Sequence, residues 1–262
     1  MSMRNADLTR GGASADRAMN PRRAAGWQGE APKPAARCGL ILAGGRNTRM
    51  GGKLKPALTF SGETVLERIV GAMAELCGHI YVAVAADTPV SQLQIEEIEQ
   101  RIGVPLIVRT DRLADIGPLG GIVSALHEGR QEPAEAVWVS AGDMPFVSAA
   151  AAARMLADLR GETEAVVPDV EGRRQPLQAV YRTRALCEAA KVCIARGDRS
   201  MARLLAQLRV TYLNDAAWDA AGIAKRFVRN VNTPEEYERA LEEERREAEG
   251  FASEEEQRKG AE

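Results

Sequence analysis

Short apolar segments alternate with helical patterns through the middle of the chain, and this alternation constrains the fold more than any other feature. The near-continuous apolar segments, which predict strands, cover 38–43, 80–85, 104–108, 136–141, 165–167 and 177–181. The segments with apolar residues at three- and four-residue spacing, which predict helices, cover 64–76, 91–102, 119–128 and 148–159. Apolar strands separated by helices form a mostly parallel sheet that is covered on both faces. We therefore expect a doubly wound, Rossmann-like α/β domain that binds its ligand beyond the carboxyl ends of the strands.

The two ends of the chain differ from this middle in composition. Residues 1–37 contain seven basic and three acidic residues without apolar periodicity, which predicts a disordered basic extension. Residues 38–240 carry the α/β pattern, and 241–262 are expected to form an acidic tail that is helical or disordered. The length of 262 residues fits a single domain with two solvated extensions.

Charge and cysteine spacing exclude several classes of protein. The formal net charge is −2 and the isoelectric point about 5.9, which argues against binding to nucleic acid through a general basic surface. No run of about 18 apolar residues is present, so no membrane-spanning helix is expected. The four cysteines lack C-x-x-C spacing, which argues against a zinc or redox site. Arg22 and Arg23 are not followed by an apolar segment, so we expect no export signal and a cytoplasmic location.

A glycine-rich basic loop follows the first expected strand, with the sequence LAGGRNTRMGGKLKP over residues 42–56. Its glycines allow the backbone N–H groups to approach an anion closely. Its cations are Arg46, Arg49, Lys53 and Lys55. This composition suits a polyphosphate, because backbone donors orient the oxygens while Arg and Lys neutralise their charge. The spacing matches neither Walker A nor the dinucleotide G-x-G-x-x-G loop.

Two further positions are candidates for a metal site. Asp143 directly follows the strand AVWVSA, where a carboxylate is well placed to bind Mg²⁺ together with substrate phosphate oxygens. The alternative for Asp143 is a helix N-cap. Asn232 precedes a helix start in which Thr233 is the N-cap, Pro234 the first residue and Glu236 the third. Its amide oxygen is a candidate ligand for the same metal.

The loop over residues 111–121 has glycines that permit close packing of a flat base. Asp111 or Asp115 could accept hydrogen bonds from a purine, although a capped turn explains the same residues. Farther along, Arg173 and Arg174 are candidates for a second phosphate, or they form a solvated hairpin tip.

Together, these segments resemble the molybdenum cofactor guanylyltransferases, within a wider superfamily of nucleotidyltransferases. The resemblance covers about residues 38–240 and rests on LAGG-x₃-RMGG-x₂-K, D-x₃-D-x-GPLGG, GDMPF, QPLQAVY and NVNTPEE, in that order. The first motif indicates nucleotidyl transfer, and the combination of RMGG, GPLGG and NVNTPEE favours the molybdenum cofactor branch. The resemblance implies Mg²⁺-dependent transfer of GMP from GTP to molybdenum-molybdopterin, with molybdoenzymes or their chaperones as candidate partners.

The resemblance also assigns roles to individual residues. The residues implied in binding GTP are Leu42, Ala43, Gly44, Gly45, Lys55, Asp111 and Asp143. The residues implied in catalysis are Arg49, Lys55 and Asp143, and those implied in binding Mg²⁺ are Asp143 and Asn232, with Asn230 less directly. Two positions depart from the family pattern. Leu54 replaces the Asp that usually precedes the lysine, and Ala83 replaces an Asn that contacts the nucleotide.

Three other functions remain open at the level of sequence. The first is a sister enzyme that uses CTP on the same cofactor, and the second is a nucleotidyltransferase that acts on another small phosphate. The third is a nucleotide-binding accessory protein without turnover, which Lys55 and Asp143 argue against, because binding alone does not need a metal at the α-phosphate.

Overall fold

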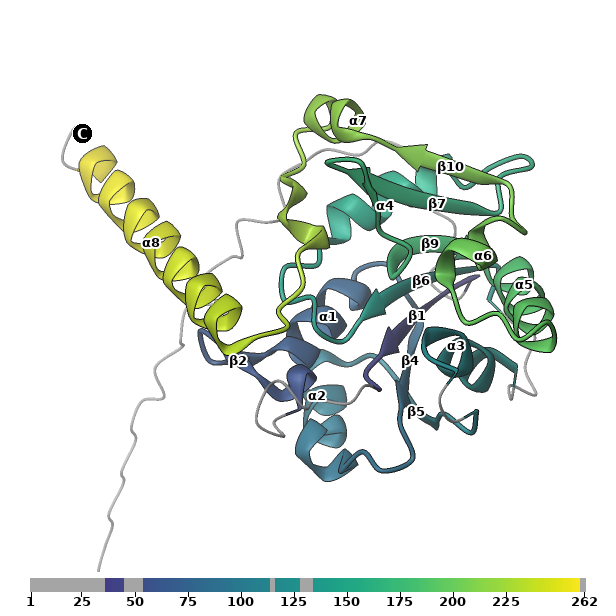
Figure 1. Ribbon diagram of the computed structural model, residues 1–262. Helices are drawn as coiled ribbons and strands as arrows, with labels where there is room; N and C mark the ends of the chain where they lie inside the picture. Colours follow the sequence, from purple (N-terminus) through teal and green to yellow (C-terminus); the bar gives the residue numbers. More distant parts are fainter. Residues whose placement is uncertain (1–35, 45–53, 114–115, 128–133, 260–262) are drawn as a thin grey trace, which may run out of the picture. The chain divides into compact units, whose positions relative to one another are not determined.

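The computed structural model describes residues 36–44, 54–113, 116–127 and 134–259. Their centre is a sheet whose main strands lie in the order β10-β7-β9-β6-β1-β4-β5 (Figure 1). In chain order the bounds of these strands are β1 Arg37–Leu42, β4 His79–Val84, β5 Leu106–Thr110, β6 Ala136–Ala141, β7 Ala165–Val170, β9 Gln178–Arg182 and β10 Val210–Leu213. β1 pairs in parallel with both β4 and β6. The pairs β4–β5 and β7–β10 are also parallel.

One strand runs against this direction. β9 lies between β6 and β7 and is antiparallel to both. A two-residue strand, β8 (Arg173–Arg174), extends the sheet as a hairpin with β7. Because β9 is antiparallel to both of its neighbours, β6 and β7 run in the same direction. The carboxyl ends of β1, β4, β6 and β7 therefore lie at one edge of the sheet. The mostly parallel α/β fold predicted from the sequence is confirmed.

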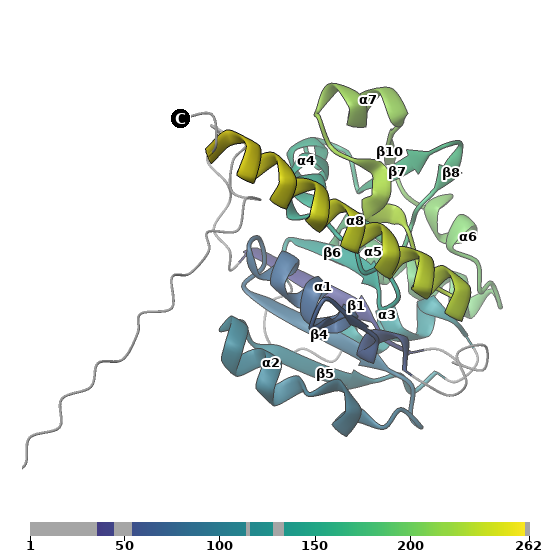
Figure 2. The same cartoon turned by 90° about the vertical axis from the view of Figure 1, so that its left-hand side faces the viewer.

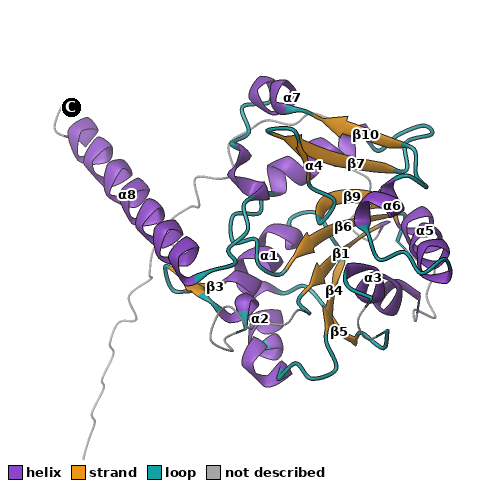
Figure 3. Cartoon of the chain, in the orientation of Figure 1, coloured by secondary structure: helices purple, strands orange, loops and turns teal. Residues whose placement is uncertain are grey.

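The helices cover both faces of the sheet (Figures 2 and 3). On one face lie α1 (Val65–Ala74), α2 (Ile95–Ile102) and α4 (Ala149–Asp158), whose buried side chains share a core with Ile41 and Trp138. On the other face lie α3 (Pro118–His127), α5 (Thr183–Ala195) and α6 (Met201–Leu205), packed on Leu40 and Val139. Alternate side chains of β1 and β6 therefore belong to two cores, one on each face of the sheet, as expected of strands that are apolar on both faces.

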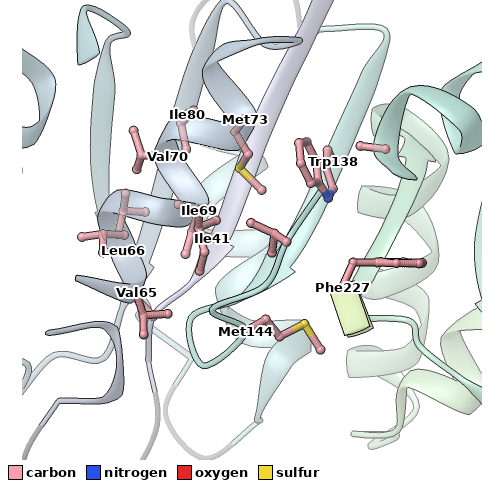
Figure 4. Packing of buried hydrophobic residues seen from close by; sticks show 14 of the residues in the cluster. Ile41, Val65, Leu66, Ile69, Val70, Met73, Ile80, Trp138, Met144 and Phe227 are labelled. Carbon is pink, nitrogen blue, oxygen red and sulfur yellow. The ribbon is translucent and has the colours of Figure 1, made fainter. Parts of the chain in front are cut away.

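The first of these cores shows why β1 contains a glycine. Leu66, Ile69 and Met73 of α1 belong to the same buried cluster as Ile41 and Trp138, and Ile69 lies beside Ile41 in Figure 4. A Cβ added to Gly39 would lie 2.5 Å from the Met73 Sδ atom, so a larger residue would force the Met73 side chain to move.

Element boundaries follow local chemistry. α1 begins with a capping box between Thr64 and Glu67, and Ser148 caps α4 through the Ala151 N–H group. β5 begins two residues later than its apolar pattern predicts. Pro105 has no N–H group for the ladder, and Arg109 and Thr110 continue the strand despite their polarity.

Several elements were not predicted from apolar spacing. A hairpin of β2 (Thr59–Phe60) and β3 (Glu63–Thr64) turns through Ser61 and Gly62, both with positive φ. Near the C-terminus come α7 (Asp215–Ala220), a 3-10 helix (Lys225–Val228) and α8 (Pro234–Lys259). Within the described ranges, no helix is both long and apolar enough to cross a membrane.

Candidate functional site

The carboxyl ends of β1 and β6 lie in direct contact. The Gly142 N–H group donates to the Leu42 carbonyl at 2.9 Å, which continues the pairing of the two strands beyond the sheet. A Cβ on Gly142 would lie 3.0 Å from Pro56 Cγ and 3.1 Å from the Ala43 Cα atom. The glycine therefore lets the segment after β6 approach the segment that carries Lys55.

Lys55 is the centre of the candidate site. It begins a 3-10 helix, Lys55–Ala57, and its Nζ atom lies 3.0 Å from Asp143 Oδ2. The same ammonium donates to Asn232 Oδ1 at 2.5 Å. The side chains of Lys55 and Asp143 are 20% and 19% exposed, so this charged pair is accessible to a ligand from one side. Three residues from distant parts of the chain thus meet at the edge where the fold class predicts ligand binding.

Asn232 is held by the start of α8. Its backbone N–H donates to Glu236 Oε2 at 2.6 Å, and Glu236 exchanges hydrogen bonds with Thr233. The predicted helix start at Thr233 is confirmed. The N–H group of Val231 donates to the Asp143 carbonyl at 2.9 Å, so the segment with Asn232 is tied directly to Asp143. Asn230 is exposed.

The residue before Lys55 contributes to packing. Leu54 is 8% exposed and belongs to the core beneath α1. An acidic residue at this position would be a local anchor for the lysine, whereas here Asp143 and Asn232 anchor it from other elements.

The backbone at the end of β1 is closely packed. The Ala43 N–H group donates to the Ala83 carbonyl at 2.8 Å, and Gly44 passes so near the end of β4 that a Cβ would lie 3.1 Å from the Ala85 nitrogen. The predicted loop residues Gly45, Arg46, Arg49 and Lys53, together with Asp115, lie outside the described residues.

Asp111 follows β5, and its side chain supports its own loop. Asp111 Oδ1 accepts hydrogen bonds from the Leu113 N–H at 2.9 Å and from the Ser124 hydroxyl at 3.2 Å. A Cβ on Gly120 would lie 2.7 and 2.8 Å from the two carboxylate oxygens, so α3 approaches Asp111 through a glycine. The capped turn that was the structural alternative is present.

Ala83 lies beside this turn. It is 2% exposed, and it pairs with Leu42 across the parallel strands. A Cβ on Gly121 would lie 3.0 Å from Leu42 Cδ2 and 3.5 Å from the Ala83 Cβ, so α3 packs tightly over this pair. The Ala83 side chain is therefore part of the packing beneath α3 and supplies no amide, as an asparagine would.

Arg173 and Arg174 are exposed on β8, at the carboxyl end of β7. The Arg174 guanidinium lies over the Tyr212 ring, 4.4 Å from its centroid. Arg173 and Arg174 lie at the same edge of the sheet as Lys55 and Asp143. In the strand order, β9 separates β7, beside which the two arginines lie, from β6, which precedes Asp143.

The buried titratable groups of the strands lie away from this edge. Burial raises the pKa of Cys38 and of Cys77 to about 12, so both remain thiols at neutral pH. His79 begins β4 at the opposite edge, and burial lowers its pKa. The polar chemistry of the site, within the part of the chain that the structure describes, therefore comes from one ammonium, one carboxylate and one amide.

Comparisons with known proteins show the family of this chain. The family described as "MobA-like NTP transferase domain" matches residues 39–214. A probable molybdenum cofactor guanylyltransferase of Bacillus cytotoxicus is 34% identical over 206 residues, which are 78% of this chain and 95% of the relative. A protein with the same description from Bacillus cereus is 35% identical over 204 residues, which are 77% of this chain and 94% of the relative.

Solved structures show the same fold. Molybdopterin-guanine dinucleotide biosynthesis protein A from Archaeoglobus fulgidus has a TM-score of 0.54 and 23% identity, covering 79% of this chain and 97% of its own. The inositol-1-phosphate CTP transferase from T. maritima has a TM-score of 0.57 and 14% identity, covering 79% of this chain and 95% of its own. The chain belongs to the MobA-like NTP transferase domain family and is a nucleotidyltransferase.

Proposed function

We propose that this member of the MobA-like NTP transferase family transfers GMP from GTP to the terminal phosphate of molybdenum-molybdopterin, and that the reaction depends on Mg²⁺. The observation that carries the proposal is the meeting of Lys55, Asp143 and Asn232 at the carboxyl ends of β1 and β6. The names of the Bacillus relatives supply the substrates.

The reaction joins two phosphates. An oxygen of the acceptor's terminal phosphate forms a bond to the α-phosphorus of GTP, and the bond from that phosphorus to the oxygen bridging to the β-phosphate breaks. The electron pair leaves with pyrophosphate. Because the nucleophile is already an anion, the enzyme needs no general base and forms no covalent intermediate. Alignment and stabilisation of charge are its main contributions.

The residues divide these tasks. Lys55 binds the phosphates and stabilises the departing pyrophosphate, together with Arg49 of the glycine-rich loop. The backbone of Leu42, Ala43, Gly44 and Gly45 orients the nucleotide. Among the described residues, the Lys55 ammonium has two hydrogen-bond partners, Asp143 and Asn232. A phosphate oxygen can replace either of them.

The donor set fits Mg²⁺. The oxygens Asp143 Oδ2 and Asn232 Oδ1 both face one cation, the Lys55 ammonium, at 3.0 and 2.5 Å. Magnesium in nucleotide sites is usually held by one or two carboxylates with phosphate oxygens and water. Asp143 and Asn232 would hold the ion, which would supply neutralisation of charge on the α-phosphate.

Selectivity for guanine rests on the loop with Asp111 and on the backbone around it. Ala83 is buried and carries no amide, so one base contact of the family pattern is missing, and the CTP-using sister enzyme is the second candidate. Asp111 Oδ2 accepts no hydrogen bond from the described residues and can accept one from a purine.

The acceptor is placed on the β6–β9–β7 side of the edge. Arg173 and Arg174 are exposed there and would neutralise its phosphate. We place the reaction in the cytoplasm, where the four free, buried cysteines remain reduced, and its product would pass to molybdoenzymes or their chaperones.

Pyrophosphate release tests the proposal. The purified protein is mixed with Mg²⁺ and molybdenum-loaded molybdopterin, with GTP, CTP, ATP and UTP in parallel, and EDTA in a matched set. We expect release with GTP and its loss with EDTA. Release with CTP alone would identify the sister activity. Binding of nucleotide without release from any of the four would indicate another acceptor or an accessory protein.

A further inference from the structure

Three aromatic side chains meet just outside the Lys55 centre. Phe60, Phe146 and Tyr237 follow Lys55, Asp143 and Asn232 in the chain by five, three and five positions. The Phe60 ring packs edge to face on Phe146, with centroids 6.0 Å apart, and on Tyr237 at 5.0 Å. The segments that carry the three site residues therefore converge a second time through an aromatic cluster.

Tyr237 fastens the β2–β3 hairpin to α8. Its hydroxyl donates to the Thr59 carbonyl at 2.5 Å. Thr59 begins β2 directly after the segment with Lys55, while Tyr237 lies in the first turns of α8, after Asn232. This hydrogen bond connects the chain on either side of the Lys55–Asn232 contact.

A charged layer continues the same connection. Glu244 of α8 pairs with Arg68 of α1 at 2.6 Å and accepts a hydrogen bond from the Ser61 hydroxyl at 2.7 Å. Arg68 also donates to the Phe60 carbonyl at 2.7 Å, and its guanidinium lies 5.3 Å from the Phe60 ring centroid. The Arg68 and Glu244 side chains are only 11% and 20% exposed, so this pair is less screened than a surface ion pair.

Phe146 is held from the other side by two arginines. Arg226 and Arg229 lie 5.5 and 5.7 Å from its ring centroid. They pair with Glu247 and Glu243, which lie on α8 on either side of Glu244. The helix therefore contacts both the segment after Lys55 and, through these arginines, the segment after Asp143.

We propose that Tyr237 and Glu244 are positioning residues that hold the β2–β3 hairpin, and with it Lys55, at the correct distance from Asp143 and Asn232. We call Tyr237, Glu244, Arg68 and Phe60 the α8 clasp. The inference rests on the proposed function, because it assigns the clasp to the alignment of Lys55 for transfer. Both α8 residues lie beyond residues 39–214, the range of the family match.

The expected effect follows from the sensitivity of catalysis to alignment. A displacement of about 1 Å in a reacting group can lower a rate about 10²-fold. Loss of Glu244 loosens the hairpin, while the hydrogen bond from the Tyr237 hydroxyl to the Thr59 carbonyl still limits how far Lys55 moves, so a partial loss of rate is expected. The effect falls on kcat, because binding of GTP also uses the backbone at the end of β1.

Three variants and one matched control test the clasp. Glu244→Gln removes the charge, and Tyr237→Phe removes the hydroxyl but keeps the ring. Glu242→Gln is the control, because Glu242 lies on the same helix and pairs with Arg246 four residues later on α8. Pyrophosphate release is measured at a temperature below the measured unfolding transition of every variant. We expect Glu244→Gln to lower kcat about 10-fold while the KM for GTP changes less than about 3-fold. Glu244→Asp, which keeps the charge, should recover most of the loss, and the control should match the wild type.

Hydrogen exchange supplies a readout that does not need turnover. The Leu58 N–H donates to the Lys55 carbonyl at 3.1 Å, and the Val65 N–H donates to the Leu58 carbonyl at 2.8 Å. In Glu244→Gln these amides should exchange faster than in Glu242→Gln, with β6 unchanged. Equal kcat and equal exchange in the two variants would overturn the inference, and so would a lower Tm with unchanged kcat. A wild type that releases no pyrophosphate would refute the proposed function, while exchange would still decide whether the clasp holds the hairpin.

Discussion

The two ends of the candidate site are built in different ways. At the phosphate end, Lys55, Asp143 and Asn232 come from three distant segments and bind one another. At the base end, around Asp111, Ala83 and Gly120, the polar atoms bind their own loop and the apolar ones pack beneath α3. The first arrangement joins three segments far apart in the chain, whereas the side-chain hydrogen bonds of the second span no more than 13 residues.

This difference separates two kinds of work. Charged groups that bind mainly one another can exchange a partner for a phosphate or a metal ion, so the phosphate end is suited to charge chemistry. A turn whose side chain binds its own backbone is rigid, so the base end is suited to recognition by shape and by backbone atoms. We therefore expect substitutions at the first end to change the rate, and at the second to change stability and nucleotide affinity.

The largest effect is expected from Asp143→Asn. The amide keeps the shape of the side chain but removes the charge opposite Lys55 and a ligand for Mg²⁺. Loss of one preorganised charge-stabilising group lowers kcat by about 10²–10³-fold, and the fold should remain intact by circular dichroism.

The control for Asp143→Asn is Asp219→Asn, on α7, where Asp219 pairs with Lys225 and is 64% exposed. It should leave pyrophosphate release unchanged. If Asp143→Asn retained full activity, the carboxylate would have no part in the reaction and the two ends would not differ in function.

A backbone change at the base end should act on stability. In Gly120→Ala the new Cβ would lie within 2.9 Å of both Asp111 oxygens and the Leu113 carbonyl, so α3 must shift. Overpacking of this kind typically costs about 1–3 kcal/mol, measured as a lower midpoint of urea unfolding.

The matched control is Gly71→Ala. Gly71 lies within α1 and has no atom within 4 Å of the added Cβ, so alanine should raise stability by about 0.5–1 kcal/mol. The changes in the free energy of unfolding should therefore have opposite signs in Gly120→Ala and Gly71→Ala. A neutral Gly120→Ala would show that the base end adapts and is not a fixed turn.

A smaller effect is expected from Ser124→Ala. The Ser124 hydroxyl donates to Asp111 Oδ1 and accepts from the Arg112 N–H, so its loss leaves the turn partly unsupported. We expect about 0.5–1.5 kcal/mol lower stability and a raised KM for GTP with unchanged kcat. Ser148→Ala, which removes the cap of α4, should lower stability without altering that KM. If the KM for GTP were equal in the two variants, the Asp111 turn would have no part in nucleotide binding.

The architecture and the phosphate end could be predicted from the sequence in part. Apolar runs identified the main strands and four helices, because burial on both faces leaves a strong pattern. Gly142 and Asp143 stood out because a carboxylate after a buried strand has no packing role. What spacing could not show is that Lys55 binds Asp143 and Asn232 directly, since that contact depends on how β1, β6 and the start of α8 meet in space.

Other features left weaker signals. α5 and β10 fall in a stretch where alanine and arginine dilute the apolar pattern, and β9 is antiparallel although its sequence resembles that of the parallel strands. The contacts of Glu244 could not be predicted, because an acidic helical tail has the same sequence pattern whether its side chains are solvated or paired with arginines. The three aromatic residues near Lys55, Asp143 and Asn232 were a signal in the sequence that could have indicated a common cluster.

The smallest effect concerns the outer layer of the phosphate end and its dependence on pH. Burial alone would raise the pKa of Glu244, but hydrogen bonds from Arg68 and Ser61 and the charges of Arg68 and Arg226 outweigh it and hold the pKa below its usual value. Glu63, which lies 3.8 Å from Arg68, is the nearby acid that competes for the same guanidinium. A carboxyl with a lowered native pKa stabilises the fold above its unfolded pKa of about 4.3, and the contribution is lost as pH falls through the native value. Wild type and Glu244→Gln should therefore differ in Tm at pH 7, and the difference should shrink as pH falls through the lowered native pKa of Glu244, whereas Glu242→Gln should follow the wild type throughout. A difference in Tm that did not shrink on acidification would mean that Glu244 supports α8 through packing, and the charged layer would then have no part in the distinction between the two ends.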